Sequence, residues 1–471
     1  MTYRSLTALA LLALLLLFGA SSRIHESSQP FEPEASTIDL VMFRGNPERN
    51  LSAVGTVPRR PKLLWRFQTK TKYEGRYERR RRRGLTAATR WQGLGWTGQP
   101  VRLGDRIYFG STDSYVYCVD AATGAEIWHY PNHHSIKGSV MIHDGCLYHG
   151  GRDNKLHCCT LDGDMIWQTR TGNDIDSSPA IVNGRGYVGT EDGHIVCFDP
   201  HSGDILWKRP AKGSVESSVC VVGGRVFAGC EGGVLYCRDA ESGDEVWTFN
   251  TGGDTDSTPV HFEGRIYVGS PTRSGRVAGR LWCIDAATGD MIWKARLPRG
   301  VWASPAVNPD RGRVYIGCNN GVLYCFDADT GDLVWKRHLG SRIWSSAAVT
   351  DGCVVVGVRD GGTLWCLNED DGSPIWAFDD GFDIDATPCV AGGMIVVGSQ
   401  NGWVYGIGEA PEYEPINPHW FRTSEMLTQP TDHDPTGIPT IYSSAPAPRT
   451  WRDTHAGCTD NLYYPVRAPA P

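Results

Sequence analysis

The sequence predicts an all-β protein built from repeated units, because tryptophans recur along most of the chain at nearly even spacing. From the second of them onward they lie 39 to 46 residues apart. The eight positions are Trp65, Trp128, Trp167, Trp207, Trp247, Trp293, Trp335 and Trp376. A period of about 40 residues with four short strands per unit is typical of a β-propeller, in which each repeat forms one blade.

Each unit follows the same order of elements. A short apolar strand leads through a turn to a strand ending in Gly, and a second turn leads to a strand ending in Cys. A Gly-containing turn then precedes the Trp strand, as in Cys118-Val-Asp120-Ala-Ala-Thr123-Gly124-Ala-Glu-Ile-Trp128. We expect the Asp to cap the turn, the Gly to supply a positive φ and the Trp to bridge neighbouring blades.

The repeated pattern C-x-D-x-x-[TS]-G-x-x-x-W resembles the tryptophan-docking motif of the pyrroloquinoline-quinone-like (PQQ-like) propeller repeats, which usually carry Ala at the first position. The resemblance covers residues 62–410, with departures at Thr160, Asn368 and Asp371. It implies that the eight tryptophans have a structural role, docking each blade on the next.

The way the ring closes is also visible in the sequence. The eighth unit stops after Gly408 without a Trp strand, and the missing strand occurs near the other end as Leu63-Leu64-Trp65-Arg66-Phe67. Pairing these two segments leaves no free sheet edge. We therefore expect an eight-bladed propeller of four-stranded antiparallel blades, with the N-terminal strand completing the last blade.

The two ends are expected to lie outside the propeller of residues 62–410. Residues 6–20 form a charge-free apolar run after Arg4, so residues 1–22 are expected to be a signal peptide or an N-terminal anchor. No Cys follows that run, which argues against a lipoprotein anchor. Residues 23–61 resemble a polar linker, and residues 411–471 a Pro-rich extended tail. The propeller is thus expected to be exported, either periplasmic or membrane-anchored and facing away from the cytoplasm.

Fifteen cysteines in an exported protein raise the question of disulfides. Seven of them occupy one repeat position and are expected to be small apolar fillers: Cys118, Cys158, Cys197, Cys237, Cys283, Cys325 and Cys366. Some PQQ-dependent dehydrogenases hold a disulfide between adjacent cysteines beside the cofactor. Here Cys158 of the Cys158-Cys159 pair falls on the filler position, which favours a structural role.

A candidate ligand site follows from the ring geometry, because loops that converge on one mouth of a propeller favour binding. The residues just before the innermost strands are, in blade order, Trp96, Lys137, Asp176, Glu216, Asp256, Trp302, Trp344 and Asp385. The repeat places three carboxylates side by side in blades 3 to 5, suited to a cation or a basic peptide. Three indoles of blades 6, 7 and 1 could stack a ring or a sugar. The alternative is an ordinary solvated lining.

The charge of the chain bears on its partners. A net charge of −7 over 471 residues argues against a general nucleic-acid binder. An insertion between the closing strand and blade 1 contains five consecutive arginines, Arg79–Arg83. It is either a basic arm for an anionic partner or a solvated loop. Membrane contact is expected only through the N-terminal segment.

Two functions remain after these observations. The chain is similar to exported, non-catalytic PQQ-like repeat proteins of BamB type, which implies a scaffold or recognition module that binds protein partners in the cell envelope. The alternative is a quinoprotein dehydrogenase that uses PQQ and Ca²⁺ to oxidise an alcohol or sugar. That enzyme would need a base such as Asp176, Asp256 or Asp385 and an aromatic floor such as Trp302 or Trp344. The blades are short and the chain lacks a haem-attachment C-x-x-C-H, so we expect no cofactor.

Overall fold

The computed structural model describes residues 39–70, 98–271 and 278–428. The chain divides into two compact units, residues 1–423 and 424–471, and of the second only the short helix α3 (Ser424–Thr428) is described. Within the described residues, every helix is too short or too polar to cross a lipid bilayer. The following paragraphs concern the first unit.

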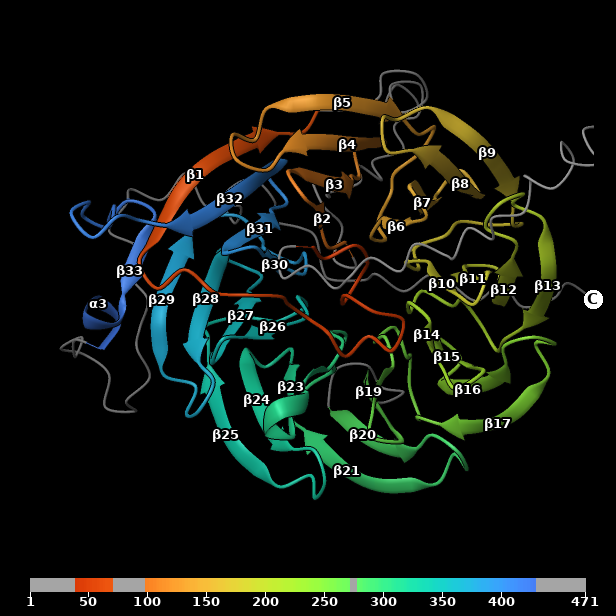
Figure 1. Cartoon of the computed structure of the whole chain (residues 1–471). Coiled ribbons are helices and arrows are strands. Elements are labelled where there is room, and N and C mark those ends of the chain that lie inside the picture. Colours follow the sequence, from red (N-terminus) through yellow and green to blue (C-terminus); the bar gives the residue numbers. More distant parts are fainter. Residues whose placement is uncertain (1–38, 71–97, 272–277, 429–471) are drawn as a thin grey trace, which may run out of the picture. The chain divides into compact units, whose positions relative to one another are not determined.

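The first unit is a ring of eight antiparallel sheets, which confirms the predicted eight-bladed propeller (Figure 1). Blade 1 is β2 (Val101–Leu103), β3 (Arg106–Gly110), β4 (Tyr115–Asp120) and β5 (Glu126–Pro131). Blade 2 is β6 (Met141–His143), β7 (Cys146–Gly151), β8 (Lys155–Thr160) and β9 (Met165–Arg170). Blade 3 is β10 (Ala180–Val182), β11 (Arg185–Thr190), β12 (His194–Phe198) and β13 (Ile205–Pro210). Blade 4 is β14 (Cys220–Val222), β15 (Arg225–Cys230), β16 (Val234–Asp239) and β17 (Glu245–Asn250).

The second half of the ring repeats this plan. Blade 5 is β18 (Val260–Phe262), β19 (Arg265–Pro271), β20 (Gly279–Asp285) and β21 (Met291–Leu297). Blade 6 is β22 (Ala306–Asn308), β23 (Arg313–Gly317), β24 (Val322–Asp327) and β25 (Leu333–His338). Blade 7 is β26 (Ala348–Thr350), β27 (Cys353–Gly357), β28 (Thr363–Asn368) and β29 (Pro374–Asp379). Blade 8 is β30 (Cys389–Ala391), β31 (Met394–Gly398), β32 (Trp403–Glu409) and β1 (Pro61–Gln68).

The ring closes as predicted. β1 pairs antiparallel with β32, with Trp65 opposite Gly406, so the N-terminal strand completes blade 8. Blade 7 has an additional outer strand, β33 (Phe421–Thr423), which pairs with β29. Residues 421–423 of the predicted tail therefore belong to a sheet. Phe421 is buried there against Trp376, with ring centroids 6.0 Å apart.

Every repeated tryptophan joins its blade to the next one. The indole N–H of Trp247, for example, donates to the carbonyl of Ala286 at 3.2 Å, in the turn before the outer strand of blade 5. The equivalent bond links all neighbouring blades. Gly289 has a positive φ, and a Cβ there would lie 2.7 Å from the Trp247 ring. The motif Gly is therefore required both by the turn and by close contact with the indole.

The other motif residues have local roles. Asp120 Oδ1 accepts hydrogen bonds from the backbone N–H and the hydroxyl of Thr123, which is the expected turn cap. The seven cysteines of the repeat position are buried free thiols. Cys158 and Cys159 are also free and pack into different hydrophobic clusters, because consecutive strand residues point to opposite faces of the sheet.

Residues 39–60, part of the segment predicted as a linker, are packed into the ring, and we call them the axial segment. In Figure 1 this red to orange stretch crosses the middle of the ring. Its backbone bonds to innermost strands on opposite sides, including Val221 N–H to Pro47 O in blade 4 and Val54 N–H to Val390 O in blade 8. The innermost strands offer unpaired N–H and C=O groups toward the axis, and the axial segment satisfies some of them. Pro58 O accepts the indole N–H of Trp376, because blade 8 has no continuous turn at that position.

A belt of hydroxyl groups holds the blades together around the axis. In six consecutive contacts, the backbone N–H that precedes an innermost strand donates to a Ser or Thr hydroxyl of the next blade, at 2.8 to 3.1 Å. The acceptors, which we call the hydroxyl belt, are Ser139, Ser178, Ser218, Thr258, Ser304 and Ser346. The residue two positions before each of them belongs to the predicted mouth.

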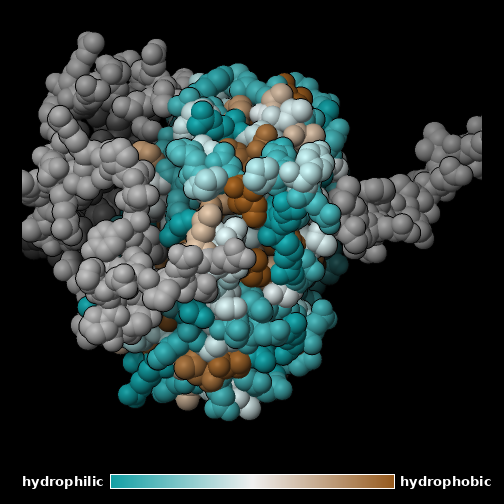
Figure 2. Space-filling model, turned by 90° about the vertical axis from the view of Figure 1, so that its left-hand side faces the viewer, coloured by the Kyte–Doolittle hydropathy of each residue, from teal (hydrophilic) through white to brown (hydrophobic). Residues whose placement is uncertain are grey.

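The apolar side chains exposed on the outer surface lie in small groups. Seen from the side, the described surface is mainly hydrophilic with small separate hydrophobic patches (Figure 2). The large exposed apolar side chains include residues just before the tryptophans of the outer strands, such as Ile127, Leu206 and Val334. Several of them form adjacent exposed pairs, such as Ile205 with Leu206, and small groups of this kind are ordinary on a protein surface.

Candidate binding site at the mouth of the ring

The described residues among the predicted mouth positions precede innermost strands, so the ring symmetry places them on one face. We call the eight positions the mouth ring. The connections between the second and third strands of the blades lie on the same face, and their first residues form a second ring that the sequence reasoning missed. Its described members include Arg152, Glu191, Glu231, Asn319, Arg359 and Gln400. Each stands two positions after the Gly of its second strand, a repeat signal that could have identified it.

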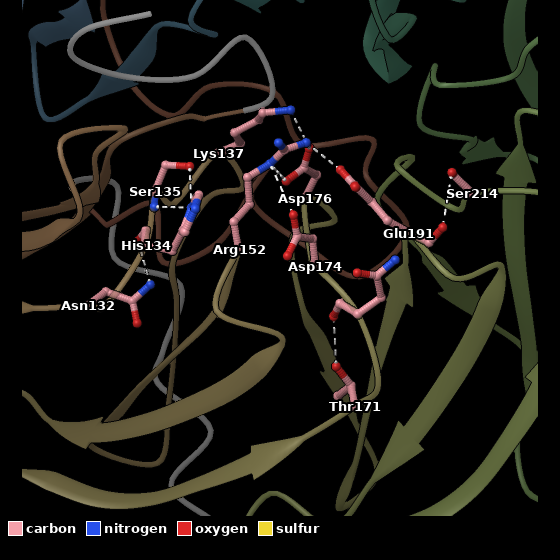
Figure 3. A network of polar contacts seen from close by, with 11 residues as sticks. Asn132, His134, Ser135, Lys137, Arg152, Thr171, Asp174, Asp176, Glu191 and Ser214 are labelled. Carbon is pink, nitrogen blue, oxygen red and sulfur yellow. Dashed lines mark hydrogen bonds and ion pairs between the residues drawn. The ribbon is translucent and has the colours of Figure 1, made fainter. Parts of the chain in front are cut away.

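The second ring contacts the mouth ring of the following blade. Arg152 of blade 2 donates to both carboxylate oxygens of Asp176 in blade 3, at 3.0 and 2.9 Å. Lys137 donates to the same carboxylate (Figure 3). Burial by itself would raise the pKa of the fully buried Asp176, but the charges of Lys137 and Arg152 outweigh it and hold the pKa below its usual value. Asp176 is therefore a charged, ion-paired anchor of this side of the mouth.

Glu191 extends this network toward blade 4. Arg152 also donates to its carboxylate, and oxygens of Asp176, Glu191 and Glu216 lie within 4.8 Å of one another. Burial, followed by the charge of Asp176, raises the pKa of Glu191 to about 8. These three carboxylates could hold a cation, but Asp176 and Glu191 already bind resident cationic side chains.

The next two mouth carboxylates have no such partners. Within the described residues, Glu216 and Asp256 accept no hydrogen bond and form no ion pair, and Asp256 Oδ1 is buried. Burial and then the charge of Asp176 raise the pKa of Glu216 to about 7. Burial and then the charges of Glu216 and Glu231 raise the pKa of Asp256 well above its usual value. This side of the mouth thus carries carboxylates that would gain from a positive group.

The opposite side of the mouth is aromatic and basic. Trp302 and Trp344 meet edge to face, with ring centroids 5.2 Å apart. Arg359 lies 3.7 Å over the ring of Trp344 and donates to Asp385 at 2.9 Å. Asp385 is fully buried, and its Oδ1 has no partner within the part of the chain that is described. Burial raises the pKa of Asp385 to about 7 against the opposing charge of Arg359.

The predicted N-terminal signal peptide or anchor of residues 1–22 and the tail beyond residue 428 lie outside the described residues, as do two features of the predicted mouth face. They are Trp96, the mouth-ring residue of blade 1, and the arginine run Arg79–Arg83. Among the described members, the structure brings Lys137 to Asp176, Asp176 to Glu216, and Trp302 to Trp344. The mouth is therefore divided into an acidic side in blades 3 to 5 and an aromatic side in blades 6 and 7. That any of these residues binds a ligand remains a prediction.

Sequence comparison with known proteins points to the same family in two ways. A family model described as "Outer membrane protein assembly factor BamB" matches residues 112–233, 191–278, 231–335 and 277–410. Outer membrane protein assembly factor BamB of Burkholderia pseudomallei (strain K96243) is 26% identical over 99 residues, which are 21% of this chain and 26% of the relative. The aligned part thus spans about a quarter of that relative's length.

Solved structures share the fold at low identity. BamB from Moraxella catarrhalis superimposes with a TM-score of 0.58 and 19% identity, over 74% of this chain and 99% of that chain. A europium-containing methanol dehydrogenase superimposes with a TM-score of 0.64 and 13% identity, over 79% and 98%. These two likenesses establish the fold alone. Because the family model covers more than half of the sequence, the chain belongs to the PQQ-like propeller family of the outer membrane protein assembly factor BamB.

Proposed function

We propose that this protein is an exported, non-catalytic scaffold of the cell envelope, and that the acidic side of its mouth binds a positively charged segment of a partner protein. Family membership supports a protein-binding role, and the apolar run of residues 6–20 supports export. Membrane contact would be limited to that N-terminal segment.

The observation that carries the proposal is the contrast between neighbouring carboxylates. Asp176 is bound by an ammonium and a guanidinium of the protein itself, whereas Glu216 and Asp256 form no ion pair and accept no hydrogen bond within the described residues. The geometry at Asp176 shows that this rim accommodates Lys and Arg side chains. A Lys or Arg of a partner could bind Glu216 and Asp256 in the same manner, and it would lower their raised pKa values.

The test is a binding measurement with a fluorescent Arg- and Lys-rich peptide at low salt. The double variant Glu216→Gln with Asp256→Asn should bind roughly tenfold more weakly than the native protein, because two carboxylates no longer attract the peptide. The matched control is Asp244→Asn with Glu245→Gln, which makes the same two replacements in an exposed hairpin of blade 4. Equal loss of affinity in both variants would show that net charge, and not the mouth, attracts the peptide. Ca²⁺ in place of the peptide tests the simple-cation alternative.

The second candidate is a PQQ-dependent dehydrogenase, favoured by the buried carboxyl of Asp385 beside Arg359 and Trp344. The fit is poor, because Arg359 covers the ring of Trp344 at 3.7 Å and Trp302 meets that ring edge-on. A planar quinone would have to displace the guanidinium in order to stack there. Absorption spectra of the protein incubated with PQQ and Ca²⁺, together with alcohol oxidation assays, would decide for the enzyme if a bound quinone and turnover appeared.

A further inference from the structure

Two arginines are completely buried on the axis of the ring, and both belong to the axial segment. Arg44 and Arg49 each have 0% of their surface exposed. Both also adopt a left-handed backbone conformation, with φ of 55° and 63°. Such conformations are unfavourable for residues other than glycine, so the surrounding structure must impose them.

The two guanidinium groups have very different surroundings. Arg49 donates to four backbone carbonyls, those of Phe43, Ser178, Pro179 and Val219. Arg44 uses only Nε, which donates to the carbonyl of Arg49 at 2.8 Å. Within the described residues, Nη1 and Nη2 of Arg44 are buried without a hydrogen-bond partner, and neither arginine has a carboxylate within ion-pair distance.

This arrangement is incomplete as it stands. Burial, and then for Arg44 the charge of Arg49, lowers the pKa of Arg44 to about 9 and that of Arg49 to about 10, so both groups are charged at neutral pH. An uncompensated buried charge with orphaned donors costs several kcal/mol. A negative group would offset the repulsion between the two guanidinium groups, and the planar fork of two Nη atoms suits an anion.

We propose that the axis of the propeller contains a site for a small anion, held by Nη1 and Nη2 of Arg44. Gln99 fixes the position of this arginine, since its Oε1 accepts the Arg44 backbone N–H and its Nε2 donates to Pro388 O. Thr387 donates its backbone N–H to Gly98 O, next to Gln99, and its buried hydroxyl has no partner within the described chain. The anion compensates the two buried charges and ties the axial segment to the ring. This site is independent of the acidic side of the mouth.

The first experiment measures thermal unfolding of the full chain against anion concentration, at constant ionic strength with gluconate as the large counter-ion. Chloride and phosphate are titrated separately, so the experiment distinguishes a site for a halide from a site for an oxyanion. The native protein should gain a few degrees in Tm, and the gain should saturate, as expected for a ligand that binds only the folded state. Arg44→Met should abolish this gain, and at low anion concentration it should melt no lower than the native protein.

The control is Arg102→Met, which removes another arginine that bonds to backbone carbonyls and should leave the anion response intact. If Arg44→Met retained the full response, or the native protein showed none, the proposal would be overturned. A second measurement does not depend on the variant folding. Crystals of the native protein soaked in bromide or in selenate should show an anomalous peak at hydrogen-bond distance from Arg44 Nη1 and Nη2. If neither bromide nor selenate gave such a peak, the proposal would likewise be overturned.

Discussion

At the scale of single residues, the docking tryptophan does more than fill space between blades. The Trp247 indole donates a hydrogen bond to Ala286 O and lies directly on Gly289 of the next blade. The neighbouring repeat position, Cys237, is buried but is a plain thiol packed among apolar side chains. The two positions recur together, yet they contribute to stability by different amounts.

We expect Trp247→Ala to lower the free energy of unfolding by about 3–5 kcal/mol, because it leaves a cavity between blades and an unpaired carbonyl. Cys237→Ala should cost much less, since it removes only one sulfur atom. Urea or guanidinium titrations of both variants measure the difference. The opposite order of stabilities would show that blade docking does not depend on the indole.

The raised pKa of the mouth carboxylate Glu216 determines whether the protein becomes more or less stable as the pH rises. The pKa of Glu216 rises from 4.5 in the unfolded chain to about 7 in the folded protein, so the folded state binds the proton more tightly. Stability from this group is fully present below about pH 4.5 and is lost as the pH rises through 7. Glu216→Gln should therefore stabilise the protein at pH 8 by about 1–3 kcal/mol and have little effect at pH 4. Chemical denaturation at both pH values tests this, and an equal effect at both would contradict the raised pKa.

At the scale of elements, the sequence predicted those parts of the fold that recur in every repeat. The docking motif is local and recurs with each unit, so blade number, strand order and closure by β1 followed from the pattern alone. The axial segment has no periodicity, and its hydrogen bonds go to backbone groups of blades that are distant in sequence. Glu191 was not predicted as a site residue, because the mouth was predicted from one repeat position only. β33 is three residues long, and no pattern distinguishes it from the tail around it.

β1 and β33, the strands contributed by the two ends of the unit, should contribute differently to its stability. Deleting residues 62–68 removes Trp65 and the partner of β32, which leaves blade 8 with an open edge and an empty docking site. We expect aggregation or a large fall in Tm. Truncation after Ala410 removes β33 and contacts such as the Lys62–Glu414 ion pair and the Trp420 ring on Phe378, but leaves all four strands of blades 7 and 8 in place, and should lower Tm by a few degrees. Calorimetry of both truncations tests this, and similar melting of the first truncation and the full chain would refute closure by β1.

At the scale of the whole first unit, the axis is organised in layers that the chain builds in different ways. The mouth ring and the hydroxyl belt come from the repeats, and in blades 2 to 7 their residues are two positions apart. The axial segment is added once, and its hydrogen bonds reach blades on opposite sides of the ring, among them blades 2, 4, 7 and 8. The axial segment therefore adds links across the centre of the ring to the contacts between adjacent blades.

These links predict that the axial segment stabilises the ring without specifying it. Replacing residues 39–57 by a Gly- and Ser-rich stretch, with Pro58 and β1 retained, should leave the β-sheet content unchanged, because the docking tryptophans and the closure remain. Tm should fall by several degrees, since the innermost strands lose hydrogen-bond partners at the axis. The anion response should vanish with Arg44. Circular dichroism, calorimetry and the chloride and phosphate titrations provide the three readouts. Loss of all sheet structure would instead mean that the segment is required for the ring to form, whereas an unchanged Tm would mean that its buried arginines cost as much as its hydrogen bonds contribute.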